Sequence, residues 1–192
     1  MEDPDQRLLK EIATGGEKAL GELIDRYRDR LFRFVYRSVR NEADAAEIVS
    51  ETFVRVHRFA GTYRPRAKAV TWIYTIATNL CRDHHRRSRP LLSLFWKPPG
   101  SKGEAGASLA ERIPDAGPSA DENLLQAERK ARVLELIDSL PSKLKTPFIL
   151  NVLEEHSQKE CADILGVSEK TVETRVYRAR RRLRDGLRKG GF

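Results

Sequence analysis

Two stretches rich in lysine and arginine are the clearest candidates for chemistry in this sequence, and that chemistry would be ionic contact with phosphate groups. Residues 63–89 carry seven Lys or Arg against Asp83 alone, and residues 169–192 carry nine against three acidic residues. Each block is therefore net +6, whereas the whole chain is +8, so the remaining residues are net acidic. Two separate basic blocks favour contacts with a nucleic-acid backbone, although solvated charged helices are the alternative interpretation.

Metal chemistry has little support in the sequence. Cys81, His84 and His85 form the nearest cluster of metal ligands, but no second pair of ligands matches it. Because a zinc site needs about four ligands, we predict no metal and no cofactor. Cys81 and Cys161 are the only cysteines, and both lie in apolar periodic runs. Their placement indicates buried, reduced thiols and a cytoplasmic protein rather than a disulfide.

Apolar residues recur at three- and four-residue spacing around the first basic block. The spacing predicts amphipathic helices over residues 17–39, about 42–60 and about 69–87. Gly61 is expected to end the second helix, and Pro65 to keep the residue before it out of a helix. The third helix should bury Trp72, Ile73, Ile76, Ala77, Leu80 and Cys81.

The character of the chain changes between residues 88 and 120, where proline and glycine interrupt any sustained periodicity. This composition predicts a linker. Its exception is the apolar patch Leu91–Trp96, which a plain spacer would not need. The sequence leaves open whether the patch docks on a partner or folds back onto the first domain.

Helical periodicity returns near Asp121. One helix should run to about Leu140, a second should have Pro141 in its first turn, and Pro147 should bend that helix or delay its start. We therefore predict an all-α fold of two small helical domains joined by a flexible linker. No apolar run approaches the roughly 20 residues that span a bilayer, so we expect no membrane insertion. The expected boundaries are 1–90 for the first domain, 91–120 for the linker and 121–192 for the second domain.

The most specific feature is a helix-turn-helix pattern within residues 157–183. A short helix over 158–165 should end at Gly166, which can adopt the left-handed conformation, and Ser168 is a good N-cap for the next helix. That next helix buries valines at i, i+4 spacing and presents polar and basic side chains on its other face. Such a helix can enter a major groove and read base edges.

The sequence resembles bacterial sigma factors in two blocks that occur in the family's order. Leu140-Pro141 and the pattern Ala-x-x-Leu-Gly-x-Ser-x-x-Thr-Val-x-x-Arg-x-x-Arg-Ala-Arg, beginning at Ala162, are similar to region four of the extracytoplasmic-function (ECF) branch. Residues 45–55 and 72–84 are similar to the polymerase-binding and −10 recognition helices of region two. The resemblance implies a factor that brings core RNA polymerase to promoters and opens them. Because the chemistry would belong to the polymerase, no catalytic residue is expected.

The resemblance also assigns a partner to each segment. The 44–59 helix would grip the polymerase clamp, the loop 61–68 with Asn79 would hold a base extruded from the single-stranded −10 element, and the last helix would read the −35 duplex. The implied polymerase contacts are Asp44, Glu47, Ser50, Glu51, Phe53 and Arg55. The implied −10 contacts are Tyr63, Arg64, Asn79, Arg82, Arg86 and Arg87, and the implied −35 contacts are Lys170, Thr171, Glu173, Thr174, Arg175, Tyr177 and Arg178.

Members of the ECF branch are commonly held inactive by an anti-sigma protein, so the resemblance implies such a partner here. Two other hypotheses remain at this point. A stand-alone helix-turn-helix regulator would bind duplex DNA tightly without polymerase, and an enzyme would need a ligand or catalytic cluster that the sequence does not display.

Overall fold

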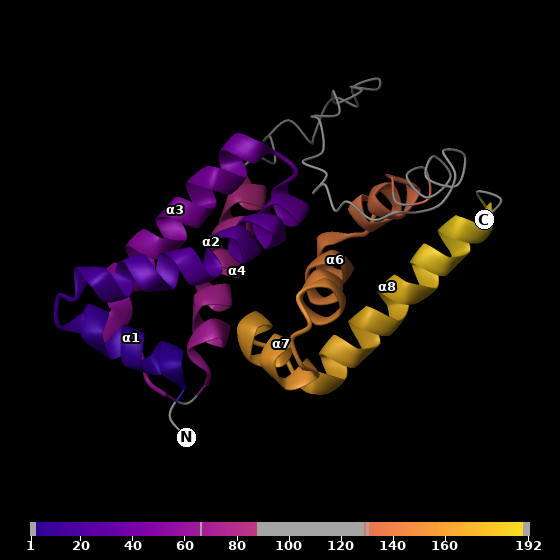
Figure 1. The fold of residues 1–192 in the computed structure, drawn as a ribbon. Coiled ribbons are helices and arrows are strands. Elements are labelled where there is room, and N and C mark those ends of the chain that lie inside the picture. Colours follow the sequence, from indigo (N-terminus) through magenta and orange to yellow (C-terminus); the bar gives the residue numbers. More distant parts are fainter. Residues whose placement is uncertain (1–2, 66, 88–128, 130, 190–192) are drawn as a thin grey trace, which may run out of the picture.

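The computed structural model of the protein describes residues 3–65, 67–87, 129 and 131–189, and every regular element among them is a helix (Figure 1). The predicted all-α fold of two helical domains is therefore confirmed. The expected linker at 91–120, with its Leu91–Trp96 patch, lies outside the described residues.

The N-terminal domain packs three long helices whose bounds follow the apolar spacing closely. Gly61 does not end the second of them through a left-handed turn. It lies instead in a single 3-10 turn, Ala60–Thr62, and its φ is not positive. The apolar faces of the three helices meet in one core. The helices are α2 (Glu17–Val39), α3 (Glu42–Phe59) and α4 (Ala69–Arg87).

A shorter helix, α1 (Pro4–Ala13), precedes them, and the sequence pattern did not predict it. It is ten residues long, too short to give a clear periodic signal. The Asp3 carboxylate caps it by accepting from the amide of Asp5 at 3.1 Å. The other oxygen of Asp3 accepts from the amide of Ala69 at 3.3 Å. The same side chain therefore also fixes the start of α4.

Helix α4 is buried by two different neighbours, which changes the face that the sequence predicts. Trp72 and Ile76 are only partly buried, contrary to expectation, whereas Tyr74 is completely enclosed. The Tyr74 ring contacts Phe34 of α2 on one side and His156 of the C-terminal domain on the other. A stripe drawn for one amphipathic helix assumes a single buried face, so it misses the face that the other domain covers. The expected stripe is correct at Ile73, Ala77, Leu80 and Cys81.

The described part of the C-terminal domain opens with a helix over residues 131–138, and the remaining elements follow Pro141. Pro141 is the N-cap of the next helix, one position earlier than expected. Pro147 lies inside that helix, and the backbone widens directly afterwards into a π-helical turn. The elements are α6 (Ser142–Phe148), η3 (Ile149–Leu153), α7 (Gln158–Leu165) and α8 (Glu169–Lys189).

The helix-turn-helix forms as the sequence predicts, through local hydrogen bonds. Ser157 and Glu160 make a reciprocal capping box at the start of α7. Gly166 ends α7 with a φ of 64°, and Ser168 accepts from the amide of Thr171 at 3.2 Å to cap α8. The buried stripe of α8 consists of Val172, Val176 and Ala179.

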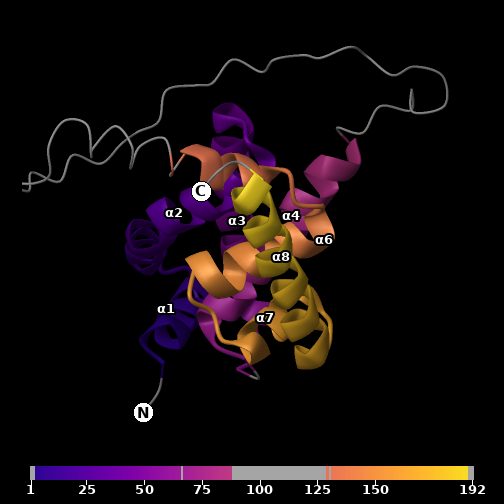
Figure 2. The same cartoon turned by 90° about the vertical axis from the view of Figure 1, so that its right-hand side faces the viewer.

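The two domains pack against each other, with α7 lying along α4 (Figures 1 and 2). Residues of both domains share one apolar cluster, in which Ile73 and Ala77 of the first domain belong with Cys161 and Ile164 of the second. We call this packing the closed arrangement. It places the helix-turn-helix directly beside the helix that the sequence assigns to the −10 element.

Candidate functional site

The expected polymerase contacts gather around one hollow of about 470 Å³ on the N-terminal domain. Helix α3 forms one wall with alternating acidic and basic side chains, and the end of α4 forms the other with Asp83, His84 and Arg87. Nε2 of His84 lies 3.5 Å from a carboxylate oxygen of Asp44, which ties the walls together. The structure thus unites five of the expected residues: Asp44, Glu47, Ser50, Glu51 and Arg55.

Phe53 is the exception among the expected polymerase contacts. Its side chain is 7% exposed and packs in the core, so it holds α3 in place and cannot itself present a surface. The neighbouring Val54 is 58% exposed and lines the hollow instead. Sequence reasoning missed Val54 because it lies outside the apolar stripe. An exposed valine inside a charged hollow is the signal that could have identified it.

The expected −10 residues form a stripe along α4 rather than a closed pocket. At its start, the rings of Tyr63 and Trp72 lie 5.3 Å apart, and the Tyr63 hydroxyl donates to the carbonyl of Ala67 at 2.6 Å. Farther along, Arg82 donates to the side-chain oxygen of Asn79 at 3.3 Å. Asn79 is exposed and lies two helical turns, about 10 Å, beyond Trp72 on the same side of α4.

The separation between the loop and Asn79 corrects one part of the expectation. The loop ends at Lys68, eleven residues before Asn79, which corresponds to about 16 Å along a helix axis. The loop and Asn79 can contact successive nucleotides of a strand but do not enclose one base between them. Arg64, Arg86 and Arg87 are exposed at the two ends of this stripe.

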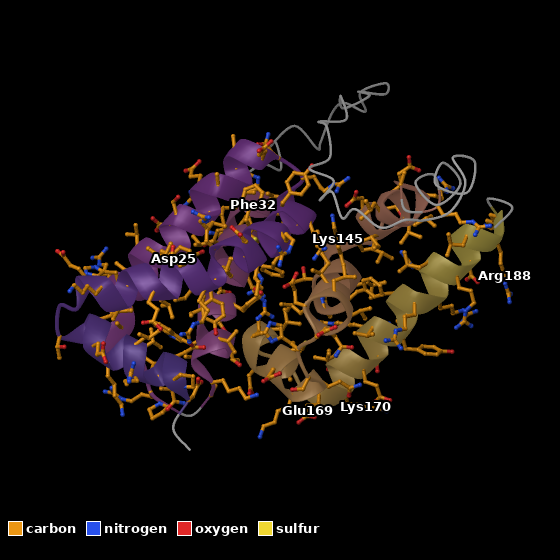
Figure 3. The ribbon with its side chains drawn as sticks, in the orientation of Figure 1. Asp25, Phe32, Lys145, Glu169, Lys170 and Arg188 are labelled. Atoms are coloured by element: carbon orange, nitrogen blue, oxygen red, sulfur yellow. The ribbon has the colours of Figure 1, made fainter. Side chains whose placement is uncertain are left out.

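The expected −35 residues occupy the first half of α8. Lys170 and Glu173 form an ion pair of 2.8 Å, and the Thr174 hydroxyl donates to the carbonyl of Lys170. Tyr177 is 66% exposed, and Arg178 is also exposed. Figure 3 shows Glu169 and Lys170 at one end of α8 and Arg188 at the other. The reading face is therefore continuous over about two turns, with Thr171 beside the cap.

One cleft between the domains brings the two sets of expected DNA contacts together. It has a volume of about 560 Å³ and lies between the end of α4 and the starts of α6 and α8. Four of its lining side chains are cationic, and none of its described lining residues is acidic. Arg175 therefore faces the −10 helix rather than open solvent. The cations are Arg82, Arg86, Lys143 and Arg175.

A polar network on the other side of α4 fastens the domains to each other. The carboxylate of Glu154, 6% exposed, accepts from Arg37 at 2.9 Å and from the Tyr74 hydroxyl at 3.0 Å. Burial, followed by the neighbouring Glu154 charge, raises the pKa of Tyr74, so the phenol remains protonated and able to donate. The sequence pattern singled out neither Tyr74 nor Glu154, because their contact spans 80 positions.

A second contact of this kind involves the first helix of the helix-turn-helix. Lys68 lies 2.9 Å from Glu160. Burial alone would raise the pKa of the Glu160 carboxyl, but hydrogen bonds from Lys68 and Ser157 outweigh burial and lower this pKa to about 2. Burial also lowers the pKa of His156, whose Nε2 has no hydrogen-bond partner among the described residues.

The two cysteines are free thiols in the interior, as the sequence predicts. Burial raises the pKa of each thiol to about 12, so both are unreactive near neutral pH. Within the described residues, His, Cys, Asp and Glu form no cluster able to hold a metal ion. In the same part of the chain, no helix combines the length and apolar character that a membrane span requires.

Two family matches cover the helices that carry these surfaces. The Sigma-70 region 2 family matches residues 23–90, and the family described as Sigma-70, region 4 matches residues 130–183. The first match contains α3 and α4, and the second contains the helix-turn-helix. Their order along the chain is the order that the sequence resemblance implied.

Individual proteins support the same assignment. The chain is 30% identical over 181 residues to the ECF RNA polymerase sigma-E factor of Escherichia coli (strain K12), covering 92% of this chain and 90% of that one. Its fold is similar to that of CnrH in complex with the cytosolic domain of CnrY, with a TM-score of 0.70, 24% identity, and coverage of 97% and 99% of the two chains.

A second solved structure is the sigma factor RpoE in complex with the anti-sigma factor NepR from Bartonella quintana. It matches with a TM-score of 0.62 and 17% identity, covering 89% of this chain and 98% of that one. At these identities the two structural likenesses show the fold, whereas the family matches and the relative at 30% show the family. The chain belongs to the ECF RNA polymerase sigma factors, transcription initiation factors that bind core RNA polymerase and direct it to promoters.

Proposed function

We propose that the hollow between α3 and α4 binds the polymerase clamp, that the exposed stripe of α4 contacts the single-stranded −10 element, and that the first half of α8 reads the −35 duplex. The corresponding units are residues 1–90 and 121–192, joined by a linker at 91–120. The observation that carries the proposal is the gathering of five expected polymerase contacts around one hollow that adjoins the −10 stripe. A strand held by α4 would therefore lie beside the polymerase.

The closed arrangement cannot read both promoter elements at once. The −10 and −35 elements lie about 25 base pairs apart, or roughly 85 Å of B-form DNA. Helix α8 packs on α7 and α7 packs on α4, and packed helices lie about 8–10 Å apart. The recognition helix is therefore about 20 Å from the −10 helix. We infer that the domains separate before both elements are bound.

Charge reversal within α3 tests the polymerase contact without disturbing the helix. Arg55 donates to Glu51 at 2.7 Å along α3, so the double variant Glu51→Arg, Arg55→Glu keeps an i, i+4 ion pair while reversing the surface charges. We expect at least a tenfold loss of core polymerase affinity, about 1.4 kcal/mol or more, and no specific run-off transcripts. A control pair of the same kind is Arg7→Glu, Glu11→Arg on α1, which should transcribe normally.

Wild-type affinity for core polymerase in the Glu51→Arg, Arg55→Glu variant would contradict the assignment of the hollow. Circular dichroism establishes that the variant retains its helices. A stand-alone regulator is separated from the sigma function by the same samples, because it would bind duplex DNA tightly and give no new transcripts with polymerase.

We also propose that an anti-sigma protein holds this chain in its closed arrangement in the cytoplasm, where the polymerase acts. The support is the family membership together with the fold that the chain shares with a sigma factor solved bound to its anti-sigma factor. A partner that bridges the two domains would hide Arg175 and the −10 stripe together, since both border the interdomain cleft. Its removal should restore transcription in a purified system.

A further inference from the structure

Three ion pairs join the two domains among the described residues, and all three have the same polarity. The N-terminal domain supplies every cation, and the C-terminal domain supplies every carboxylate. This polarity is unexpected from composition, because residues 169–192 of the C-terminal domain carry nine Lys or Arg against three acidic residues. We call the three carboxylates the acidic edge. The pairs are Arg37–Glu154 at 2.9 Å, Arg40–Asp138 at 2.6 Å and Lys68–Glu160 at 2.9 Å.

The basic side of this interface extends beyond the pairs themselves. Arg30 and Arg33 precede Arg37 at helical spacing, on the same side of α2. The three arginines border a polar hollow of about 380 Å³ together with Glu154 and Glu155. Arg30 and Arg33 are exposed and form no ion pair with any described residue. The acidic edge therefore neutralises only part of a longer row of positive charge.

The floor beside this row consists of polar side chains from α4. Thr71 and Thr78 are buried, and neither hydroxyl has a hydrogen-bond partner among the described residues. Between them, the Tyr74 hydroxyl is held by Glu154. Buried polar groups are normally hydrogen-bonded in folded proteins. The closed arrangement thus leaves donors of this floor unused.

The position of the floor around α4 separates it from the polymerase hollow. Successive helical residues are rotated by about 100°. Tyr74 and Asp83 therefore point in opposite directions, and Asp83 lines the hollow assigned to polymerase. Asn79 and Arg82 lie between these two directions. The floor consequently borders the −10 stripe, with the α2 arginines along its other side.

We propose that Arg30, Arg33 and Arg37 of α2, with the floor of Thr71, Tyr74 and Thr78, form a binding groove for the phosphate backbone of single-stranded DNA, and that the acidic edge occupies this groove in the free protein. The proposal rests on the proposed function, since it extends the −10 surface. Carboxylates at 2.6–2.9 Å from the cations take the places that phosphate oxygens would take. Tyr74 supplies an aromatic ring beside the row, a combination typical of single-strand binding.

Removing charge from the acidic edge tests the cover. The probe is a fluorescein-labelled 15-mer of deoxythymidylate, measured by fluorescence anisotropy with the full chain and no polymerase. We expect Glu154→Gln, Glu160→Gln to raise the affinity by about tenfold, because the covered groove becomes available in a larger fraction of molecules. Asp163→Asn removes an exposed carboxylate from the same helix, α7, and should leave the affinity unchanged.

Removing charge from the groove tests the binding surface itself. Adding Arg30→Gln and Arg33→Gln to the uncovered variant should reverse the gain and lower the slope of log K against log salt by about 1.4, or about 0.7 per phosphate contact. Arg28→Gln, on the solvent side of α2, is the matched control. The swap Lys68→Glu, Glu160→Lys retains an ion pair between the domains and should not raise the affinity.

A measurement in the holoenzyme does not depend on spontaneous opening. Arg30→Gln, Arg33→Gln should shorten the lifetime of the open promoter complex at least fivefold while core polymerase affinity stays at the wild-type value. An unchanged lifetime and salt slope would overturn the proposal, and so would a loss confined to core affinity, which would make the row a polymerase contact. Either failure leaves wild-type transcription intact, so it is distinct from failure of the sigma function itself.

Discussion

At the scale of single residues, surface chemistry was easier to predict than interdomain contacts. The reading positions of α8 follow from a local pattern, and Lys170, Glu173 and Tyr177 are exposed as expected. Tyr74 and Glu154 had no such pattern, because each acquires its role from a partner in the other domain. Val54 and Phe53 exchanged their expected places for a similar reason, since the edge of an apolar stripe depends on what packs beside it.

The carboxylate of Glu173 leads to a prediction about base preference. An acidic side chain at a reading position accepts from cytosine N4, and Lys170 holds Glu173 at the surface through their ion pair. Glu173→Gln should reduce discrimination at one base pair of the −35 element by about 1–3 kcal/mol. Selection from a randomised −35 library with the holoenzyme measures this. Asp185→Asn, farther along α8, is the control. An unchanged preference profile for Glu173→Gln would remove this residue from the reading set.

At the scale of helices and turns, the sequence predicts most where signals are local. The bounds of α2, α4 and α7 follow from apolar spacing together with Gly166 and the residues that cap the helices. Helix α1 escapes because it is short and is held partly by Asp3, which bonds to an amide 66 positions away. The π-helical turn after Pro147 escapes too, since no residue type specifies one.

The turn of the helix-turn-helix gives a stability prediction with opposite signs at two glycines. Gly166 has a φ of 64° and no neighbouring atom within 4 Å of an added Cβ. Gly166→Ala should therefore destabilise the protein by roughly 1–2 kcal/mol through backbone strain alone. Gly21 lies within helix α2 and also has free space around it, so Gly21→Ala should stabilise by about 0.5–1 kcal/mol. Urea unfolding measures both, and equal effects at the two sites would contradict the left-handed turn.

At the scale of the whole molecule, the closed arrangement should weaken in acid. The lowered pKa of Glu160 means that its stabilising contact with Lys68 is complete above about pH 4.5 and is lost as the pH falls toward 2. His156 acts in the same direction. Burial lowers its pKa below 6.5, so protonation on acidification opposes closure, with Arg30 and Lys68 adding to the effect and Glu160 opposing it.

Small-angle X-ray scattering across this range should show the radius of gyration rising before the helical circular dichroism signal is lost. Glu160→Gln should remove the lower part of the transition and His156→Gln the upper part. A radius that stays constant until the helices unfold would show that neither group controls the packing of the domains.

The domain arrangement itself could not be predicted from the sequence. Apolar residues that seal α4 against α7 read as ordinary core positions within each domain, and the ion pairs join residues between about 90 and 120 positions apart. The arrangement matters for function because the two reading helices lie much closer together than the promoter elements do.

The most direct test of domain separation is a distance between the domains measured by energy transfer, in the free protein and in the holoenzyme on a promoter that gives run-off transcripts. Cysteines introduced at Asp25 and Asp163, both exposed, accept the dyes, while the buried Cys81 and Cys161 stay unlabelled because burial raises their pKa to about 12. We predict high transfer in the free protein and near-complete loss of transfer on the promoter, where the two elements are roughly 85 Å apart. High transfer retained in a complex that initiates transcription would contradict the account.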